Sequence, residues 1–361
     1  MIAFFDMFDY PLTVNEIFYS LSVKCELREV IEAVENMVKP PLIPPFEGGR
    51  IQSPLTPLYQ GGRIIESKNG FYFLAGRSAI VAERHRRYNF TDRKFKRALL
   101  VSKIFKLIPW IKMIAVGNLL GAHNLKDDSD IDLFIVAEDK RIWLTRFFCV
   151  GIAKFLGLRP QADNSRDKIC LSFYVSDQAM DLSGLRLKEK NLDSLRQLAD
   201  RGNDKEESGN DKKINPPCPV RLSAHDEAPL LKGAEIVDIY FIYWLAGLTP
   251  LYDAGGTYQK LIKANRRLFI SLPNWQPVNP TRQRQIKPFL SEFYHDLVDL
   301  FFGGLEPQFR RAQMKIFPPA LKNLMNQDSR VVINDQIIKL HANDRREEYR
   351  EKYLEKINNL L

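Results

Sequence analysis

The chain has 361 residues, a net charge of +9 and a hydrophobic fraction of 45%. These values are ordinary for a globular protein and exclude a fibrous or wholly disordered chain. At roughly 150 residues per domain, the length predicts two or three domains. The longest uncharged apolar run, residues 239–248, is about half of the ~20 residues that a membrane-spanning helix needs. With widely spaced cysteines and no basic segment before an apolar N-terminal stretch, we expect a cytoplasmic protein without signal peptide, membrane contact or disulfides.

The first 90 residues predict two helices followed by a hairpin. Thr13 and Glu16 have the spacing of a capping box, which indicates a helix from there to about Leu21. A second helix is expected over residues 27–38, and Asn69-Gly70 between two short apolar segments indicates a β-hairpin. Elements of these types in this order are typical of a winged helix-turn-helix, which we expect over residues 1–90.

Four glutamates lie in or beside the second of these helices: Glu26, Glu29, Glu32 and Glu35. In a DNA-reading winged helix this helix would enter the major groove. Its carboxylates would then approach the phosphates, where Coulomb repulsion opposes binding. A structural or protein-contact role is therefore favoured over DNA reading.

A Pro/Gly-rich insert at residues 40–62 interrupts this unit, and one segment of it nearly repeats itself after thirteen residues. Proline at this density blocks both helix and sheet. We expect a duplicated loop without chemistry rather than a proline-rich docking segment.

Positive charge is concentrated in residues 77–112, where eleven Lys and Arg stand against two acidic residues. A basic helix is expected over residues 92–107, ended by Pro109. Such a segment attracts polyanions such as nucleic acid or the triphosphate of a nucleotide. A solvated helix face with surplus lysine and arginine is the equally weighted alternative.

Helices and strands alternate in residues 91–185, which predicts a small mixed-sheet α/β domain. Strands are expected at 112–116, 131–137 and 168–175, with a helix at 141–158. Residues 186–234 are polar and predict an exposed linker, whereas the helical period dominates residues 235–361. The predicted fold class is α+β, with an N-terminal winged helix, a central α/β domain and a C-terminal helical domain.

The most informative segment joins the end of one strand, Gly117-Asn118, to the start of the next, Asp130-Ile131-Asp132, through eleven residues. Strand alternation places Asp130 and Asp132 on one face. Two neighbouring carboxylates repel each other unless a cation lies between them, and Mg²⁺ prefers carboxylate and phosphate oxygens. A glycine turn lets backbone N–H groups approach a phosphate. The segment therefore predicts a site for a nucleotide and a metal ion.

Val116-Gly117-Asn118 followed by Asp130-Ile131-Asp132-Leu133 resembles the signature of the nucleotidyltransferase superfamily of the DNA polymerase β type. Beyond the signature, most of the chain looks like uncharacterised bacterial proteins that carry a winged helix before a nucleotidyltransferase domain. The resemblance implies Mg²⁺-dependent transfer of an NMP from an NTP, ATP being the first choice, to an unknown acceptor. It makes Asp130 and Asp132 catalytic metal ligands. The nucleotide-binding residues that we expect are Gly117, Asn118, Lys126, Ser129 and Arg146.

Two features depart from this signature. Asn118 is bulkier than the usual small residue, and the strand at 168–175 has no acid where active members usually place a third carboxylate; Ser172 stands near that position. Transfer is then weakened, or the chain is a catalytically inert nucleotide- or nucleic-acid-binding adaptor that uses the winged helix and the basic segment 77–112. A module that modifies a partner protein also stays open.

A polar cluster of His341, Asp344 and Arg346 precedes the last expected helix, which begins after Asn343. An Asn or Asp at this position caps a helix by accepting from its first N–H groups. Capping accounts for most of the cluster without chemistry.

Overall fold

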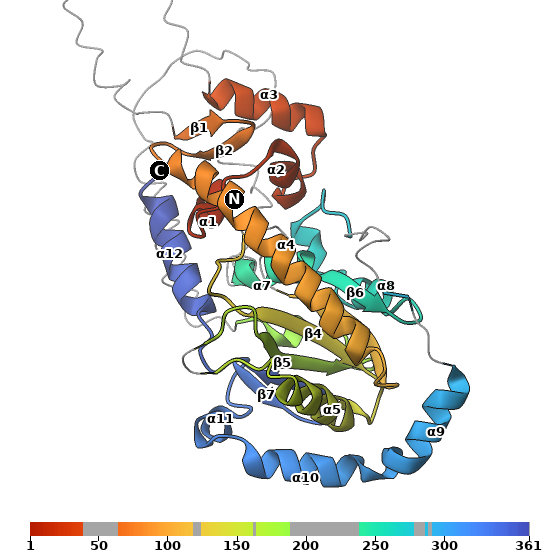
Figure 1. Cartoon of the computed structure of the whole chain (residues 1–361). Helices are drawn as coiled ribbons and strands as arrows, with labels where there is room; N and C mark the ends of the chain where they lie inside the picture. The colour runs from red at the N-terminus through yellow and green to blue at the C-terminus, as the bar shows by residue number, and fades with distance from the viewer. Residues whose placement is uncertain are drawn as a thin grey trace, which may run out of the picture.

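The computed structural model describes residues 1–38, 64–117, 124–161, 164–187, 238–277, 286–287 and 291–360. The fold is α+β, with a two-stranded hairpin near the N-terminus and a six-stranded mixed sheet (Figure 1). In the described ranges no helix is long and apolar enough to cross a membrane. The insert at 40–62, Asn118 and all but the start of the expected linker at 186–234 lie outside the described residues.

The predicted N-terminal elements are confirmed. A short helix α1 (Ile2–Asp6) precedes α2 (Val14–Ser20), α3 (Leu27–Val38), β1 (Ile65–Lys68) and β2 (Phe71–Leu74). The capping box closes because the Thr13 N–H donates to Glu16 Oε2 at 2.7 Å, while Thr13 Oγ1 accepts from the Glu16 N–H. Asn69 and Gly70 have φ values of 54° and 79°, the left-handed conformation that a tight hairpin turn requires.

The basic helix is much longer than predicted. α4 (Ala79–Phe105) is one helix of 27 residues, about 40 Å at 1.5 Å per residue, and it crosses the sheet diagonally (Figure 1). The buried side of this helix contains charged residues, because Arg87 and Lys94 are buried together with Val81 and Phe95. The sequence therefore shows no continuous apolar stripe over the whole helix. α4 thereby joins the N-terminal elements to the sheet.

The three predicted central strands form at nearly the predicted positions, as β3 (Ile111–Val116), β4 (Ile131–Ala137) and β5 (Ile169–Ser176). β3 and β4 are antiparallel, whereas β4 and β5 are parallel and are connected through α5 (Ile142–Phe155). The complete sheet has the order β6-β3-β4-β5-β8-β7.

The region after residue 235 differs from the expected helical domain, because three of its segments complete the sheet. These strands are β6 (Thr249–Asp253), β7 (Val331–Ile333) and β8 (Ile337–Leu340). At three to five residues each, they are too short for strand alternation to stand out in the sequence. The α-helices of this region are α7 (Ile239–Ala246), α8 (Thr257–Ala264), α9 (Glu292–Phe302), α10 (Glu306–Ile316), α11 (Pro319–Leu324) and α12 (Arg346–Asn358). The short 3₁₀ helices are η2 (Ser183–Leu185), η5 (Leu268–Ser271) and η7 (Gly303–Leu305).

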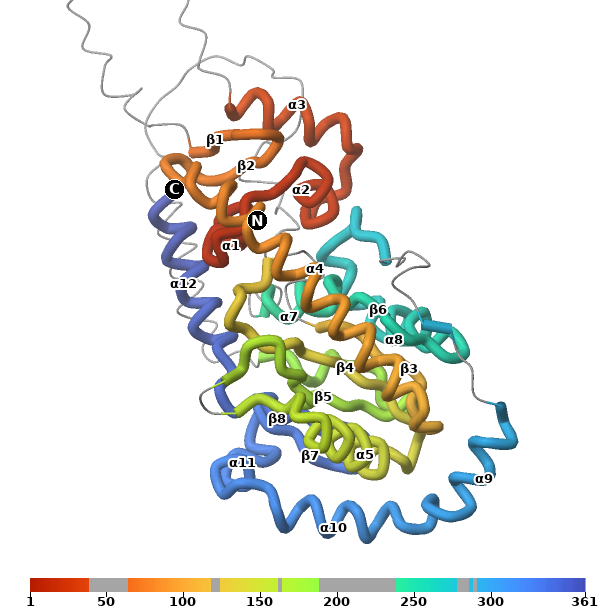
Figure 2. The backbone as a smooth tube through the Cα atoms, in the orientation of Figure 1, coloured from red at the N-terminus to blue at the C-terminus, as the bar shows by residue number. Residues whose placement is uncertain are grey.

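The two faces of the sheet carry separate cores. Residues of α4 and α5 pack with Ile131 and Leu133 on one face, and α10 covers α5. Residues of α7 and α8 pack with Phe134 and Val136 on the other. α12 runs along the side of the molecule from the sheet towards α1 (Figure 2). The side chains at the start of β4 that share the α7 face are therefore the ones that can form a site there.

Candidate metal and nucleotide site

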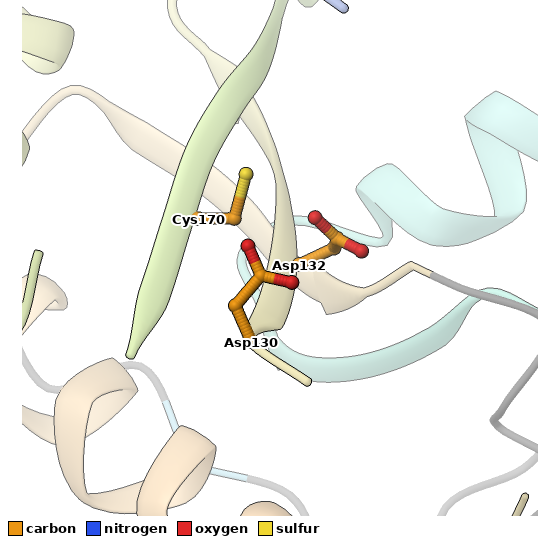
Figure 3. A group of neighbouring side chains, drawn as sticks. All are labelled: Asp130, Asp132 and Cys170. Atoms are coloured by element: carbon orange, nitrogen blue, oxygen red, sulfur yellow. The ribbon is translucent and has the colours of Figure 1, made fainter. Parts of the chain in front are cut away.

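Asp130 and Asp132 lie together, as strand alternation predicts, and a third side chain joins them. Cys170 of β5 is the direct neighbour of Asp132 in the parallel register between β4 and β5. One ligand atom from each of the three side chains lies within 4.8 Å of the other two, and all three are half-buried (Figure 3). We call this group the Asp-Asp-Cys cluster. The spacing of the cysteines along the chain does not predict this role for Cys170.

The Asp-Asp-Cys cluster concentrates negative charge at a place with limited solvation. Burial raises the pKa of Asp130. Burial and the two neighbouring carboxylates raise the pKa of the Cys170 thiol well above its usual value, so the thiol is uncharged at neutral pH. A cation between these groups would compensate the charge of the carboxylates.

Helix α4 fixes the turn that leads into β4. The ammonium group of Lys94 donates to the carbonyls of Asp127 and Ser129, at 3.1 and 2.6 Å, and to the carboxylate of Asp167 at 2.8 Å. Arg93 pairs with the same Asp127 and Asp167. The basic residues of α4 therefore position the chain immediately before Asp130.

Gly117 lies at the end of β3 beside Asp132, but its N–H donates to the Asp132 carbonyl at 3.0 Å. This N–H is therefore part of the sheet, whereas the next residues of the glycine turn, 118–123, lie outside the described residues, and their expected contact with a phosphate stays a prediction. The glycine is required for another reason, because a Cβ there would lie 3.0 Å from Leu248 Cδ2 and 3.2 Å from Trp244 Nε1. Gly117 thus allows the indole of α7 to pack against the end of the strand.

A cavity of about 210 Å³ opens beside Asp132 and Gly117. It is smaller than typical small-molecule pockets of roughly 300–1,000 Å³, so it can hold part of a nucleotide. One wall is aromatic: Trp244 stacks on Phe173 at 5.4 Å, and Tyr240 stacks on Tyr349 at 5.2 Å. The polar wall of the cavity adjoins these rings, with Arg345 lying over the ring of Tyr349 at 5.3 Å, and it consists of Lys339, His341, Asn343, Asp344, Arg345 and Arg346.

Most charges of this polar wall are already paired. Arg346 is buried between Asp238, at 2.6 Å, and Asp344, at 2.7 Å. Burial lowers the pKa of Lys339 to about 8, whereas hydrogen bonding and attraction to Arg346 outweigh burial at Asp344 and lower its pKa to about 2. Arg345 is different: it is 57% exposed and pairs with Glu348 at the surface. Such exposed pairs are weak, so Arg345 is the cation of this wall that can turn to an incoming anion.

His341 and Ser172 form a second polar contact in the cavity. Ser172 Oγ lies 2.8 Å from His341 Nε2, and the Cys170 thiol donates to Ser172 Oγ at 3.2 Å. Burial, with Lys339, lowers the pKa of His341 to about 3, so its ring is neutral at pH 7. A bulge in the pairing of β4 with β5 brings the consecutive residues Ser172 and Phe173 to the same cavity. From the sequence, helix capping accounts for most of the polar residues near His341, and the contact with Ser172 is not predicted.

Three of the expected nucleotide-binding residues, Lys126, Ser129 and Arg146, do not line the cavity. Lys126 is exposed and lines a separate surface hollow beside Asp128 and Arg166. The hydroxyl of Ser129 donates to the Lys126 carbonyl and belongs to the turn. Arg146 is buried on the opposite face of the sheet, where it donates to Gln313 at 2.6 Å and lies over the ring of Phe317. Arg146 therefore packs α5 against α10. Asn118 lies outside the described residues.

The basic segment 77–112 is neutralised largely within the molecule. Among the described residues, at least eight of its eleven cations pair with carboxylates: Arg77, Arg84, Arg86, Arg87, Arg93, Lys94, Lys96 and Lys112. Several of these pairs join α4 to other elements. The segment therefore presents much less free positive charge than its composition suggests.

No family model, curated protein or solved structure matches the chain. A functional assignment therefore rests on the geometry of this site.

Proposed function

We propose that this chain is a Mg²⁺-dependent nucleotidyltransferase that transfers an NMP from an NTP to an acceptor. The observation that carries the proposal is the meeting of Asp130 and Asp132 beside a cavity with an aromatic wall and a cationic rim. The order of α2, α3 and the β1–β2 hairpin agrees with the winged helix that the sequence resemblance implies. Two carboxylates fit Mg²⁺ bound jointly with substrate phosphates. The bound ion would neutralise the triphosphate and polarise the phosphoryl oxygens.

Different residues of the site would bind different parts of the nucleotide. Asp130 and Asp132 would hold a metal ion where Asp132 borders the cavity, and Arg345 would contact phosphate oxygens from the cavity's polar wall. Aromatic side chains that line the cavity, Tyr240 and Tyr349 among them, offer apolar surface to a base. The cavity is too small for a whole NTP, so part of the nucleotide remains outside.

Strand β5, where active nucleotidyltransferases place the third carboxylate that helps to deprotonate the acceptor, has no acidic residue here. The strand position opposite Asp132 holds the uncharged thiol of Cys170. The proton acceptor that the cavity offers instead is the neutral ring of His341, which is hydrogen-bonded to Ser172. Because a ring with so low a pKa is a weak base, we expect slow transfer.

The test is thermal unfolding of the full chain with Mg²⁺ and each common NTP in turn. At about 100 times its Kd a ligand stabilises the folded state by about 2.7 kcal/mol, which for a chain of this size raises the Tm by roughly 3–4 °C. Asp132→Asn should abolish the rise, whereas Asp128→Asn, the same change at an exposed neighbour, should retain it. A wild-type chain without any metal-dependent rise, or a D132N variant that keeps it, would overturn the proposal.

The replacement of the third carboxylate by Cys170 favours one second candidate, an inert adaptor that binds the nucleotide without turning it over. Pyrophosphate release separates the two. Release that depends on Asp132 identifies the enzyme, whereas Asp132-dependent binding without release identifies the adaptor. The pairing of eight cations in segment 77–112 weighs against the nucleic-acid-binding form of that adaptor.

A further inference from the structure

The third ligand atom beside the two carboxylates is sulfur, which changes the kind of cation that the cluster suits. Mg²⁺ demands near-octahedral oxygen ligands, and thiol sulfur is a poor ligand for it. Zn²⁺ and Co²⁺ accept sulfur together with carboxylate oxygen. We propose that the Asp-Asp-Cys cluster is a three-ligand centre that binds a thiophilic divalent cation, such as Zn²⁺ or Co²⁺, more tightly than Mg²⁺. This inference requires no nucleotide, and it concerns the same two carboxylates to which the proposed transfer assigns Mg²⁺.

The separations within the cluster suit such an ion. With metal–oxygen bonds of about 2.1 Å and metal–sulfur bonds of about 2.3 Å, the ligand atoms of one tetrahedral centre lie roughly 3.4–3.6 Å apart. The three ligand atoms now lie within 4.8 Å of one another. Side-chain rotations that move each atom by about 1 Å would bring them to the separations of a tetrahedral centre. Three protein ligands leave a fourth position open for water or substrate. Figure 3 shows the three side chains projecting from neighbouring strands to one side.

The surroundings of Cys170 differ from those of an ordinary core cysteine. Cys149 is completely buried among the apolar residues of the α5 face. Cys170 is half-buried and faces two carboxylates and the hydroxyl of Ser172, which His341 holds in turn. Hydrogen bonds of this outer kind orient a ligand and tune its metal. On binding, the S–H bond is replaced by a metal–sulfur bond and the proton passes to solvent.

The experiment is a Co²⁺ titration of the full chain without nucleotide, followed by absorbance. Binding through Cys170 should produce a near-ultraviolet sulfur-to-cobalt charge-transfer band at one ion per chain. Zn²⁺ should remove the band, whereas Mg²⁺ in large excess should not. Cys170→Ser should lose the band and bind Zn²⁺ at least about tenfold more weakly, and Cys25→Ser, at another half-buried cysteine, should retain both. Co²⁺ binding without this band, or a C170S variant with wild-type Zn²⁺ affinity, would overturn the inference.

The result is separable from the proposed transfer. A sulfur band without any Mg²⁺–NTP stabilisation supports the thiophilic centre and contradicts the nucleotidyltransferase. Mg²⁺–NTP stabilisation without a sulfur band supports the nucleotidyltransferase and contradicts the thiophilic centre. Cys170→Asp adds a further test, because an all-oxygen cluster should lose its preference for Zn²⁺ over Mg²⁺ by at least about tenfold; an unchanged preference contradicts the role of sulfur.

Discussion

His341 is held in its uncharged form by its surroundings. Burial lowers the pKa of its ring to about 3, and Lys339 and Arg346 act in the same direction against the opposing effect of Asp344. An unfolded chain protonates a histidine near pH 6.5. Between about pH 6.5 and 3 the unfolded state therefore binds the extra proton, and the free energy of unfolding decreases as the pH falls through this window.

We expect His341→Gln to flatten the pH dependence of stability between about pH 6.5 and 4, measured by urea unfolding at a series of pH values. Asp344 does not contribute in this window. Its pKa is lowered from 3.8 to about 2 in the folded state, so its effect on the free energy of unfolding appears only below about pH 3.8. His295→Gln is the opposing control. Burial lowers the pKa of His295, but hydrogen bonds to Asp296 and Glu138 raise it more. His295 therefore stabilises the fold at acid pH, and that contribution is lost as the pH rises through its raised pKa. An unchanged slope in H341Q would contradict the assignment.

Gly117 is a residue whose absent side chain matters. We expect Gly117→Ala to lower the free energy of unfolding by about 1–3 kcal/mol, because the new methyl group would displace Leu248 or the Trp244 indole. A displaced indole also deforms the aromatic wall, so the Mg²⁺–NTP stabilisation should decrease. The matched control is Gly151→Ala in α5, where nothing lies within 4 Å of the new Cβ and helix propensity predicts a gain of up to about 1 kcal/mol. Equal stability of the two variants in urea unfolding would contradict the packing argument.

At the scale of elements, α4 is a structural brace. Arg84 donates from Nη1 to Glu16 Oε2 at 2.8 Å and from Nη2 to Glu16 Oε1 at 2.6 Å, and its guanidinium lies over the ring of Tyr10. We expect Arg84→Ala to cost about 2 kcal/mol in urea unfolding, because it leaves a largely buried carboxylate without its partner. Arg86→Ala, two residues along the same helix, removes an exposed cation paired with Glu83 and should have no measurable effect. If α4 were a polyanion-binding surface instead, R86A would weaken salt-dependent DNA binding and R84A would leave stability unchanged.

The elements that the sequence predicts best are those with strong local signals. The capping box at Thr13, the Asn69-Gly70 turn and the apolar strands β3 to β5 each depend on a few neighbouring residues. α4 was predicted too short because its buried cations interrupt the apolar period, and their partners are distant in sequence. β6 and β8 are stabilised by pairing with the central strands β3 and β5, and β7 by pairing with β8, rather than by their own pattern.

The same distinction explains the candidate site. Asp130 and Asp132 are two residues apart, so alternation alone brings them together. Cys170 joins them through the register of β4 with β5, which no local pattern reveals. His341 meets Ser172 across 169 residues of sequence. Its partnership follows from the pairing of β8 with β5, so only the tertiary structure shows it.

At the scale of the whole molecule, α12 connects the cavity to the N-terminal elements. Tyr349 lines the cavity, Tyr353 one turn later packs edge-on against Phe4, and Lys356 pairs with Asp6 of α1. α7 contributes to both regions, because Trp244 faces the cavity while Tyr243 packs against Phe4 and Phe5. The cavity and the N-terminal elements therefore share two helices.

The interleaved sheet determines when the site can exist during synthesis. β3, β4 and β5 leave the ribosome early, but β6 must pair beside β3, and β8 beside β5, before both edges are covered. The carboxylates of β4 are thus made some two hundred residues before Tyr349 closes the cavity. Nascent chains that end before β8 hold an open sheet edge, and such edges attract other chains. Shortened translation products of this protein should accordingly depend on chaperones to a degree that the finished chain does not.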